Sequence, residues 1–194
     1  LGGGFLLEGK ALYLFTGFTN VGKSIVLGNI AKNVLKRNKV VVIFSMEMSE
    51  HIYSKRISAQ LSNIPMNDLI HHIPELNTKV LDFKNTYPGA KLIIKEFPTK
   101  GATVGHLNVF LSKLIKRGIK PDLVIVDYLN ILKPSKVIGS GSTYEEGKHL
   151  SEQLRASSYL FNIPFVSASQ LGRKAANTAD PGMETISESI GVSF

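Results

Sequence analysis

The eight residues from 17 to 24 constrain this chain more than any other segment, because they match the phosphate-binding pattern G-x-x-x-x-G-K-[ST] at every fixed position. They are Gly17, Phe18, Thr19, Asn20, Val21, Gly22, Lys23 and Ser24. A short apolar run from Ala11 to Thr16 precedes them, and apolar residues at helical spacing follow from Ile25 to Lys36. The pattern therefore lies between a predicted strand and a predicted helix, as a phosphate-binding loop requires.

Each residue type in this loop suits the binding of a nucleoside triphosphate such as ATP. The two glycines let the backbone turn its N–H groups toward phosphate oxygens, beside the N-terminus of a helix. Lys23 would reach the β- and γ-phosphates, and the Ser24 hydroxyl would bind Mg²⁺. We expect the whole loop, together with Ile25 at the start of the helix, to contact the nucleotide.

The composition is that of a soluble globular protein. The 194 residues suffice for one α/β domain with a sizeable core, and 43% of them are hydrophobic and 20% charged. The absence of cysteine excludes disulfides, thiolate metal sites and a cysteine nucleophile, and it fits a reducing cytoplasm. No apolar stretch approaches membrane-spanning length and no signal peptide is present, so we expect no membrane association. The chain begins at Leu1 without a methionine, and we expect an excerpt truncated at both ends.

The net charge of +8, with a pI of about 9.6, indicates a partner that is a polyanion, most often nucleic acid. A well-solvated basic surface would have the same charge without such a partner. Charge alone leaves both interpretations open.

Predicted strands and helices alternate, which indicates a mostly parallel sheet with helices on both faces, a three-layer α/β fold. Buried strands are predicted at 11–16, 40–44, 91–97, 123–127 and 163–168. Helices are predicted at 25–36, 50–62, 104–115 and 143–161, with capping residues at Ser49 and Thr143. The segment 63–87 is less regular and predicts short helices. Residues 1–194 are expected to form a single domain.

Three polar residues follow predicted strands at the sheet edge where α/β proteins bind ligands. Asp127 is placed to hold Mg²⁺, directly or through a water, as the strand-ending Asp of P-loop NTPases does. Glu47 could orient and deprotonate a water that attacks the γ-phosphate, or it could simply favour the start of the next helix. Gln170 could sense the γ-phosphate, or it could be an ordinary polar residue.

The remaining candidate residues carry less information. The five histidines show no ligand spacing with carboxylates, so a dedicated zinc or iron site is not expected. Basic side chains occur in two predicted loops that follow strands, at Lys133, Lys136, Arg173 and Lys174. Such side chains can contact a nucleic-acid backbone, although any solvated loop has a similar composition.

Four blocks in this order and spacing resemble the RecA-type motor domain of hexameric replicative DNA helicases of the bacterial DnaB type, and phage-encoded members are the most similar. The resemblance covers almost the whole chain. Its blocks are the phosphate loop, Phe44-Ser45-Met46-Glu47-Met48-Ser49, Ile125-Val126-Asp127-Tyr128-Leu129 and Ser169-Gln170-Leu171-Gly172-Arg173.

The resemblance implies a RecA-like fold and specific roles for residues of these blocks. It implies that Glu47 is the catalytic carboxylate, that Gln170 couples the nucleotide to bound DNA, and that Arg56 contacts the nucleotide. It also implies that the segments 133–142 and 172–191 grip single-stranded DNA. The second segment has Ser187 before Glu188 where bacterial relatives often have Arg, so a contact there would use backbone N–H groups or the Ser187 hydroxyl. Glu188 also completes a capping box, which is its structural alternative.

At the level of the whole protein, the resemblance implies a cytoplasmic hexameric ring that moves on single-stranded DNA and contacts a primase and a helicase loader. In such rings a neighbouring subunit supplies an arginine finger, and this finger is expected downstream of Phe194. We therefore expect the 194 residues alone to bind nucleotide but to hydrolyse it poorly.

Other functions share part of this pattern. A RecA-like recombinase or a clock-type ATPase would have the same loop, glutamate and sheet. A small-molecule kinase would need a lid with arginines, and the arginines here are scattered. A non-hydrolysing nucleotide-binding scaffold would not need Glu47. The motifs favour the helicase over these alternatives.

Overall fold

The computed structural model describes residues 9–134 and 143–170, which form a five-stranded sheet with helices on both sides. Every strand pair is parallel, and the strand order is β1-β5-β4-β2-β3. The strands are β1 Leu12–Gly17, β2 Val40–Ser45, β3 Lys91–Glu96, β4 Leu123–Asp127 and β5 Phe165–Gln170. The helices are α1 Lys23–Leu35, α2 Glu50–Ser62, α3 Ile73–Thr86, α4 Val104–Lys116 and α5 Thr143–Phe161, with short 3₁₀ turns η1 Leu69–His71 and η2 Leu129–Ile131.

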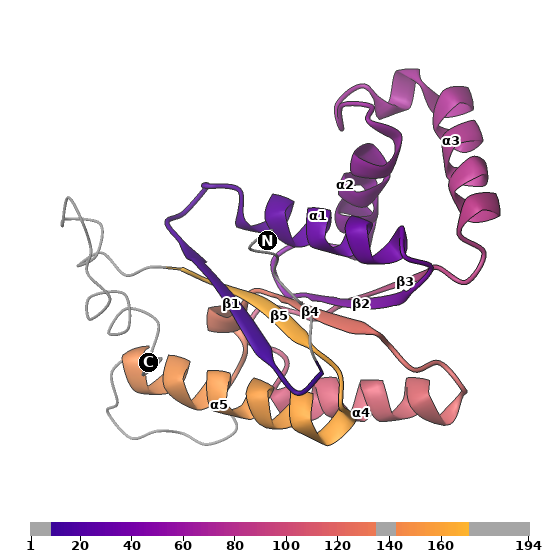
Figure 1. Ribbon diagram of the computed structural model, residues 1–194. Coiled ribbons are helices and arrows are strands. Elements are labelled where there is room, and N and C mark those ends of the chain that lie inside the picture. The colour runs from indigo at the N-terminus through magenta and orange to yellow at the C-terminus, as the bar shows by residue number, and fades with distance from the viewer. Residues whose placement is uncertain (1–8, 135–142, 171–194) are drawn as a thin grey trace, which may run out of the picture.

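The helices divide between the two faces of the sheet, so the predicted three-layer α/β architecture is confirmed. Figure 1 shows α1, α2 and α3 on one side of the sheet and α4 and α5 on the other. The connections between parallel strands run through helices, as parallel pairing demands. Among the described residues, none of the helices combines the length and the apolar character that a bilayer crossing requires.

Local sequence signals explain where several helices begin and end. The Ser49 hydroxyl accepts a hydrogen bond from the Ile52 N–H at 3.3 Å and caps α2 as predicted. Gly118 follows α4 in the left-handed region, with a φ of 78°, which glycine adopts without strain. The capping side chain predicted at Thr143 lies outside the described side chains.

Two predicted segments need correction. The stretch 63–87 holds a helix of 14 residues, α3, and Pro74 stands in its first turn, where a missing N–H costs nothing. The short helices predicted there were therefore wrong except for η1. The last strand begins at Phe165, two residues later than predicted, because Pro164 has no N–H to donate to a neighbouring strand.

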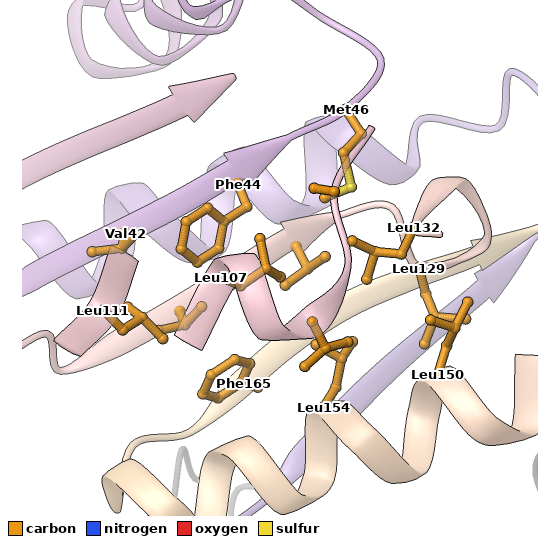
Figure 2. Packing of buried hydrophobic residues seen from close by; sticks show 14 of the residues in the cluster. Val42, Phe44, Met46, Leu107, Leu111, Leu129, Leu132, Leu150, Leu154 and Phe165 are labelled. Atoms are coloured by element: carbon orange, nitrogen blue, oxygen red, sulfur yellow. The ribbon is translucent and has the colours of Figure 1, made fainter. Parts of the chain in front are cut away.

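The central strands are buried on both faces by two separate apolar clusters. On the α1–α2 side, Ile43 and Ile125 pack with Leu27, Tyr53 and Ile57. On the other side, the strand residues Val42, Phe44 and Phe165 meet leucines of α4 and α5, as Figure 2 shows. Alternate residues of one strand serve opposite clusters, which explains why β2 and β4 are continuous apolar runs.

Candidate nucleotide-binding site

The strand register brings the predicted site residues to one edge of the sheet. Gly17 at the end of β1 is paired with Gln170 at the end of β5. Ser45 at the end of β2 is paired in the same way with Asp127 at the end of β4. The carboxyl ends of four neighbouring strands therefore meet where open parallel sheets bind their ligands.

A cavity of about 290 Å³ lies at this edge, between the phosphate loop, the segments that follow β2 and β4, and the last residue of β5. Its lining consists of Thr19, Asn20, Gly22, Lys23, Ser24, Ile25, Glu47, Met48, Arg56, Tyr128 and Gln170. The predicted loop residues Gly17, Phe18 and Val21 belong to the same loop but do not line the cavity, and Phe18 and Val21 are exposed to solvent.

The backbone of the phosphate loop favours glycine most clearly at Gly22. Gly22 has a φ of 88°, in the left-handed region, and it stands directly before α1. A Cβ on Gly17 would lie 2.9 Å from the Val21 side chain, which is closer than carbon atoms pack. No side chain of the described residues caps the N-terminus of α1, so the first N–H groups of this helix face the cavity region without a side-chain acceptor.

The Lys23 side chain is hydrogen-bonded to backbone carbonyls of the phosphate loop itself. Its ammonium group donates to the carbonyl oxygens of Gly17 at 3.1 Å and of Phe18 at 2.6 Å. An ammonium group has three N–H donors that rotate together, so the same group can turn toward a phosphate. The lysine therefore stands at the cavity wall before any ligand arrives.

Asp127 is the most unusual group of the site, because it is a carboxylate with an exposed fraction of only 1% and no hydrogen bond to the described residues. Burial raises its pKa above the ordinary value and outweighs the opposing effects of the nearby Ser24 and Tyr53 hydroxyls. The negative charge of Glu47 raises the Asp127 pKa further, and the Arg56 guanidinium lowers it. Both carboxylate oxygens are left available for a partner that the described residues do not supply.

The surroundings of Asp127 suit a magnesium ion that arrives with a nucleotide. The Ser24 hydroxyl lies close enough to influence the Asp127 pKa, so one hydroxyl and one carboxylate face the same space. Protein sites commonly hold Mg²⁺ through one or two such oxygen ligands together with substrate phosphates. Among the described residues, no three His, Asp or Glu side chains gather to bind a metal ion by themselves.

Glu47 is exposed and lines the cavity from the turn after β2. The preceding Ser45 shapes this turn, because its hydroxyl donates to the Met48 carbonyl at 2.6 Å and accepts from the Met48 N–H at 3.2 Å. Burial raises the pKa of Tyr128, another lining residue, and the nearby Glu47 carboxylate raises it further. The site thus has one buried carboxylate and one exposed carboxylate.

Gln170 bridges the end of β5 and the phosphate loop. Its side-chain amide donates to the Thr19 hydroxyl at 2.7 Å. Arg56, which is half-buried on α2, lines the same cavity. Burial raises the pKa values of both Asp127 and Tyr53, and the Arg56 charge opposes this rise only in part. The three blocks that the sequence analysis singled out beside the loop therefore converge on one cavity.

The predicted nucleic-acid contacts are only partly within the described residues. Lys133 is exposed, and its backbone N–H donates to the Ala102 carbonyl at 2.8 Å. The other predicted contacts lie outside the described residues: Lys136, Arg173, Lys174, Ser187 and Glu188.

Sequence reasoning missed four residues that the fold brings to this site. Met48 and Tyr128 line the cavity, Tyr53 lies beside Asp127, and Asn130 binds the end of β5. Tyr53 is 1% exposed and its hydroxyl has no hydrogen-bond partner among the described residues. Its spacing of three from Arg56 puts both on one face of α2, which is a signal that could have indicated it.

A loop with two glycines between a parallel strand and a helix, with Glu47 in its cavity after β2 and Asp127 at the end of β4, defines this protein as a P-loop nucleotide-binding domain with a RecA-like sheet. Residues 4–192 match the family model described as DnaB-like helicase C terminal domain. The chain therefore belongs to the family of DnaB-like helicase C-terminal domains.

Individual relatives agree with this assignment. The chain is 33% identical over 178 residues to a DnaB-like replicative helicase of Enterobacteria phage T4, a match that covers 89% of this chain and 38% of the relative. It is 25% identical over 169 residues to a probable replicative DNA helicase of Trieres chinensis, covering 86% of this chain and 36% of that protein. The chain thus spans less than two fifths of the length of these curated relatives.

A solved structure shows the same fold. It is described as a DnaB-like replicative helicase and its interactions with primase, and it superimposes with a TM-score of 0.78 at 20% identity. The match covers 96% of this chain and 46% of the other.

Proposed function

We propose that this domain is the ATP-hydrolysing motor of a replicative DNA helicase, which moves along single-stranded DNA and unwinds the duplex. One observation carries the proposal: Lys23, Glu47 and Gln170 line a single cavity, and the buried, unpaired carboxylate of Asp127 lies near Ser24 of the same lining. Membership of the DnaB-like helicase family supports the same assignment.

In this proposal the phosphate loop binds the triphosphate of ATP through its backbone N–H groups and the N-terminus of α1. Lys23 leaves the loop carbonyls and donates to the β- and γ-phosphates. Ser24 and Asp127 would hold Mg²⁺, Asp127 directly or through a water, and the ion would supply positive charge that neutralises charge developing on the phosphates. Arg56 adds positive charge on the nucleotide side of the cavity.

Glu47 and Gln170 would perform the chemical and sensing steps. The exposed Glu47 carboxylate orients the attacking water and accepts its proton, which is the usual task of a general base in phosphoryl transfer. Gln170 would exchange its hydrogen bond to Thr19 for one to the γ-phosphate. Its position would then report whether ATP or ADP occupies the cavity.

The partners of the whole protein are part of the proposal. Single-stranded DNA would contact Lys133, together with the predicted contacts that lie outside the described residues. Six subunits would form a ring in which each neighbour contributes an arginine to hydrolysis. A primase, as named for the related structure, and a helicase loader are proposed as further partners of this cytoplasmic replication machinery.

The test is the ATPase activity of the full-length protein with and without single-stranded DNA, together with unwinding of a tailed duplex. Wild-type protein is expected to show hydrolysis stimulated by single-stranded DNA and ATP-dependent unwinding. Glu47→Gln should bind ATP normally and lose turnover, whereas the exposed control Glu152→Gln on α5 should match the wild type. ATPase activity that is indifferent to DNA, or normal turnover in Glu47→Gln, would contradict the proposal.

A further inference from the structure

The pairing between β4 and β5 stops before β5 ends. The last register pair between these strands is Val126 with Ser167, whereas the pairing of β5 with β1 continues to Gln170. After Asp127 the chain leaves the sheet and forms η2. The last residues of β5 therefore need hydrogen-bond partners other than a neighbouring strand on that side.

A single carboxamide takes the place of the missing strand. The Asn130 Oδ1 oxygen accepts one hydrogen bond from the Ser169 hydroxyl at 2.9 Å and another from the Gln170 backbone N–H at 3.1 Å. Ser169 is fully buried, so its hydroxyl has no access to water as an alternative acceptor. Asn130 thus fixes the backbone of Gln170, while the Gln170 side chain remains free to change partners from Thr19.

The C-terminal end of η2 leads toward Lys133, the described residue that is predicted to contact DNA. Leu129 and Leu132, on either side of Asn130, are buried in the cluster under α4 and α5, as Figure 2 shows. The backbone N–H of Lys100 donates to the Ile131 carbonyl at 3.0 Å, and the Lys133 N–H donates to Ala102. Asn130 therefore belongs to a firmly packed segment that leads within three residues to Lys133.

We infer that Asn130 is a positioning residue, which links the Gln170 backbone to the segment leading to the DNA-binding side and so couples nucleotide state to DNA affinity. This inference rests on the proposed function. Asn130 does not contact the nucleotide cavity itself; it acts through Ser169 and Gln170. Without it, the γ-phosphate would still bind, but Gln170 would no longer move together with η2.

Binding measurements on the full-length protein test this role without relying on turnover. The affinity for a fluorescein-labelled oligothymidylate is measured with a non-hydrolysable ATP analogue and with ADP, and the ratio of the two gives the coupling factor. Coupling between two sites is commonly about fivefold or more. In Asn130→Ala we expect this factor to fall to within about twofold of unity, with the affinity for ADP unchanged. Asn130→Asp keeps an acceptor oxygen and should retain most of the coupling.

A matched control separates this role from general destabilisation. The Asn38 carboxamide oxygen also accepts a backbone N–H, that of Gly89 at 2.6 Å, but this bond lies at the amino end of β2, away from the cavity. Asn38→Ala should therefore keep the wild-type coupling factor. Equal loss of coupling in Asn38→Ala and Asn130→Ala would overturn the inference.

The possible results distinguish the inference from the function on which it rests. Wild-type protein that binds DNA equally with either nucleotide would overturn both. Wild-type protein with clear coupling, and folded Asn130→Ala with the same coupling, would overturn the role of Asn130 alone. If Asn130→Ala does not fold, Ser169→Ala removes one of the two bonds and should give an intermediate factor; a wild-type factor there would overturn the inference equally.

Discussion

The centre of the sheet and its carboxyl edge are built from the same strands, but they differ in whether their buried polar groups are hydrogen-bonded. In the centre, residues 42–44 and 124–126 are apolar and fully buried, and their backbones pair with neighbouring strands. At the carboxyl edge, both oxygens of Asp127 and the hydroxyl of Tyr53 on α2 are buried without a hydrogen bond to the described residues. The centre supplies stability, whereas the edge keeps polar groups available for a ligand.

Polar atoms that are buried without partners lower the stability of the folded protein, which is understandable if they serve to bind a ligand. A buried polar atom without a partner destabilises the folded protein by about 1–3 kcal/mol, so native proteins seldom keep several together. Three of the five such side-chain atoms in the described part of the chain are those of Asp127 and Tyr53. Their concentration near Ser24 of the phosphate loop is explained if a bound magnesium ion and nucleotide complete the site.

The largest effect is expected at the edge, from Lys23→Ala. We expect ATP turnover of the full-length protein to fall by on the order of 10²–10³, since one preorganised donor to the reacting phosphate is lost. Stability should change little, because the present partners of Lys23 are two carbonyls of a solvent-facing loop. Steady-state ATPase assays check this, with the exposed Lys36→Ala as a control. Near-normal turnover in Lys23→Ala would remove the loop from the mechanism.

In the centre, Leu111→Ala should show the reverse pattern. Leu111 is fully buried in the cluster between the sheet and α4, so truncation should cost about 3 kcal/mol in the free energy of unfolding. The affinity for nucleotide should remain within about twofold of wild type under conditions where the variant is folded. Denaturant unfolding measures the first effect, and Val109→Ala, exposed on the same helix, provides the control. A loss of only a few tenths of a kcal/mol in the free energy of unfolding would contradict the claim that the centre of the sheet supplies stability.

Asp127→Asn should reduce activity while making the unliganded protein more stable at neutral pH. Burial raises the Asp127 pKa in the folded protein above its unfolded value. At low pH the protonated carboxyl group therefore contributes to the stability of the folded protein, and this stabilisation is lost as pH rises through the folded pKa. At pH 7 the ionised carboxylate therefore opposes folding, and its removal should stabilise by about 1 kcal/mol. Thermal unfolding from pH 4 to 8 tests the sign; a variant that is less stable than wild type at pH 7 and equal at pH 4 would refute it.

Glu50→Gln should give the smallest effect and the opposite pH dependence. Glu50 begins α2 at the same end of the sheet, but its carboxylate is satisfied: it accepts from the Glu96 N–H at 3.0 Å and pairs with Lys95 at 3.4 Å. These contacts, the backbone bond first, hold its pKa below the ordinary value. Its stabilisation is therefore present above the unfolded pKa and is lost as pH falls through the folded pKa.

Because the Glu50 side chain is about half exposed, at 48%, solvent screening should limit its effect to a few tenths of a kcal/mol. Unfolding midpoints at pH 3 and pH 7 measure this difference, with Glu152→Gln on α5 as the exposed control. A larger loss of stability at pH 3 than at pH 7 would contradict the assignment.

The fold was largely predictable from the sequence, because its central strands are continuous apolar runs and Ser49 marks the start of α2. The phosphate loop was predictable for the same reason: its chemistry requires fixed residue types at fixed spacing. α3 was predicted only as short helices, since none of its residues is fully buried. The start of β5 was misplaced because Pro164 extends the apolar run without joining the strand.

The supporting residues of the site could not have been found in this way. Asn130 meets Ser169 across 39 residues of sequence, and neither residue type in isolation indicates the pairing. Tyr53 reads as an ordinary core residue of an amphipathic helix until the fold puts its hydroxyl beside Asp127. Local patterns thus predict what touches the ligand, whereas tertiary contacts decide what holds those groups in place.

The measurement that tests the central claim most directly is the thermal stability of the full-length protein with and without a non-hydrolysable ATP analogue, in Mg²⁺ and in a chelator. If the edge is incomplete without its ligand, the analogue with Mg²⁺ should stabilise the wild type by about 2.7 kcal/mol at a hundredfold excess over Kd. Asp127→Asn should lose the Mg²⁺-dependent part of this gain. A full, Mg²⁺-dependent gain in Asp127→Asn would contradict the account, because the buried carboxylate would then have no part in completing the site.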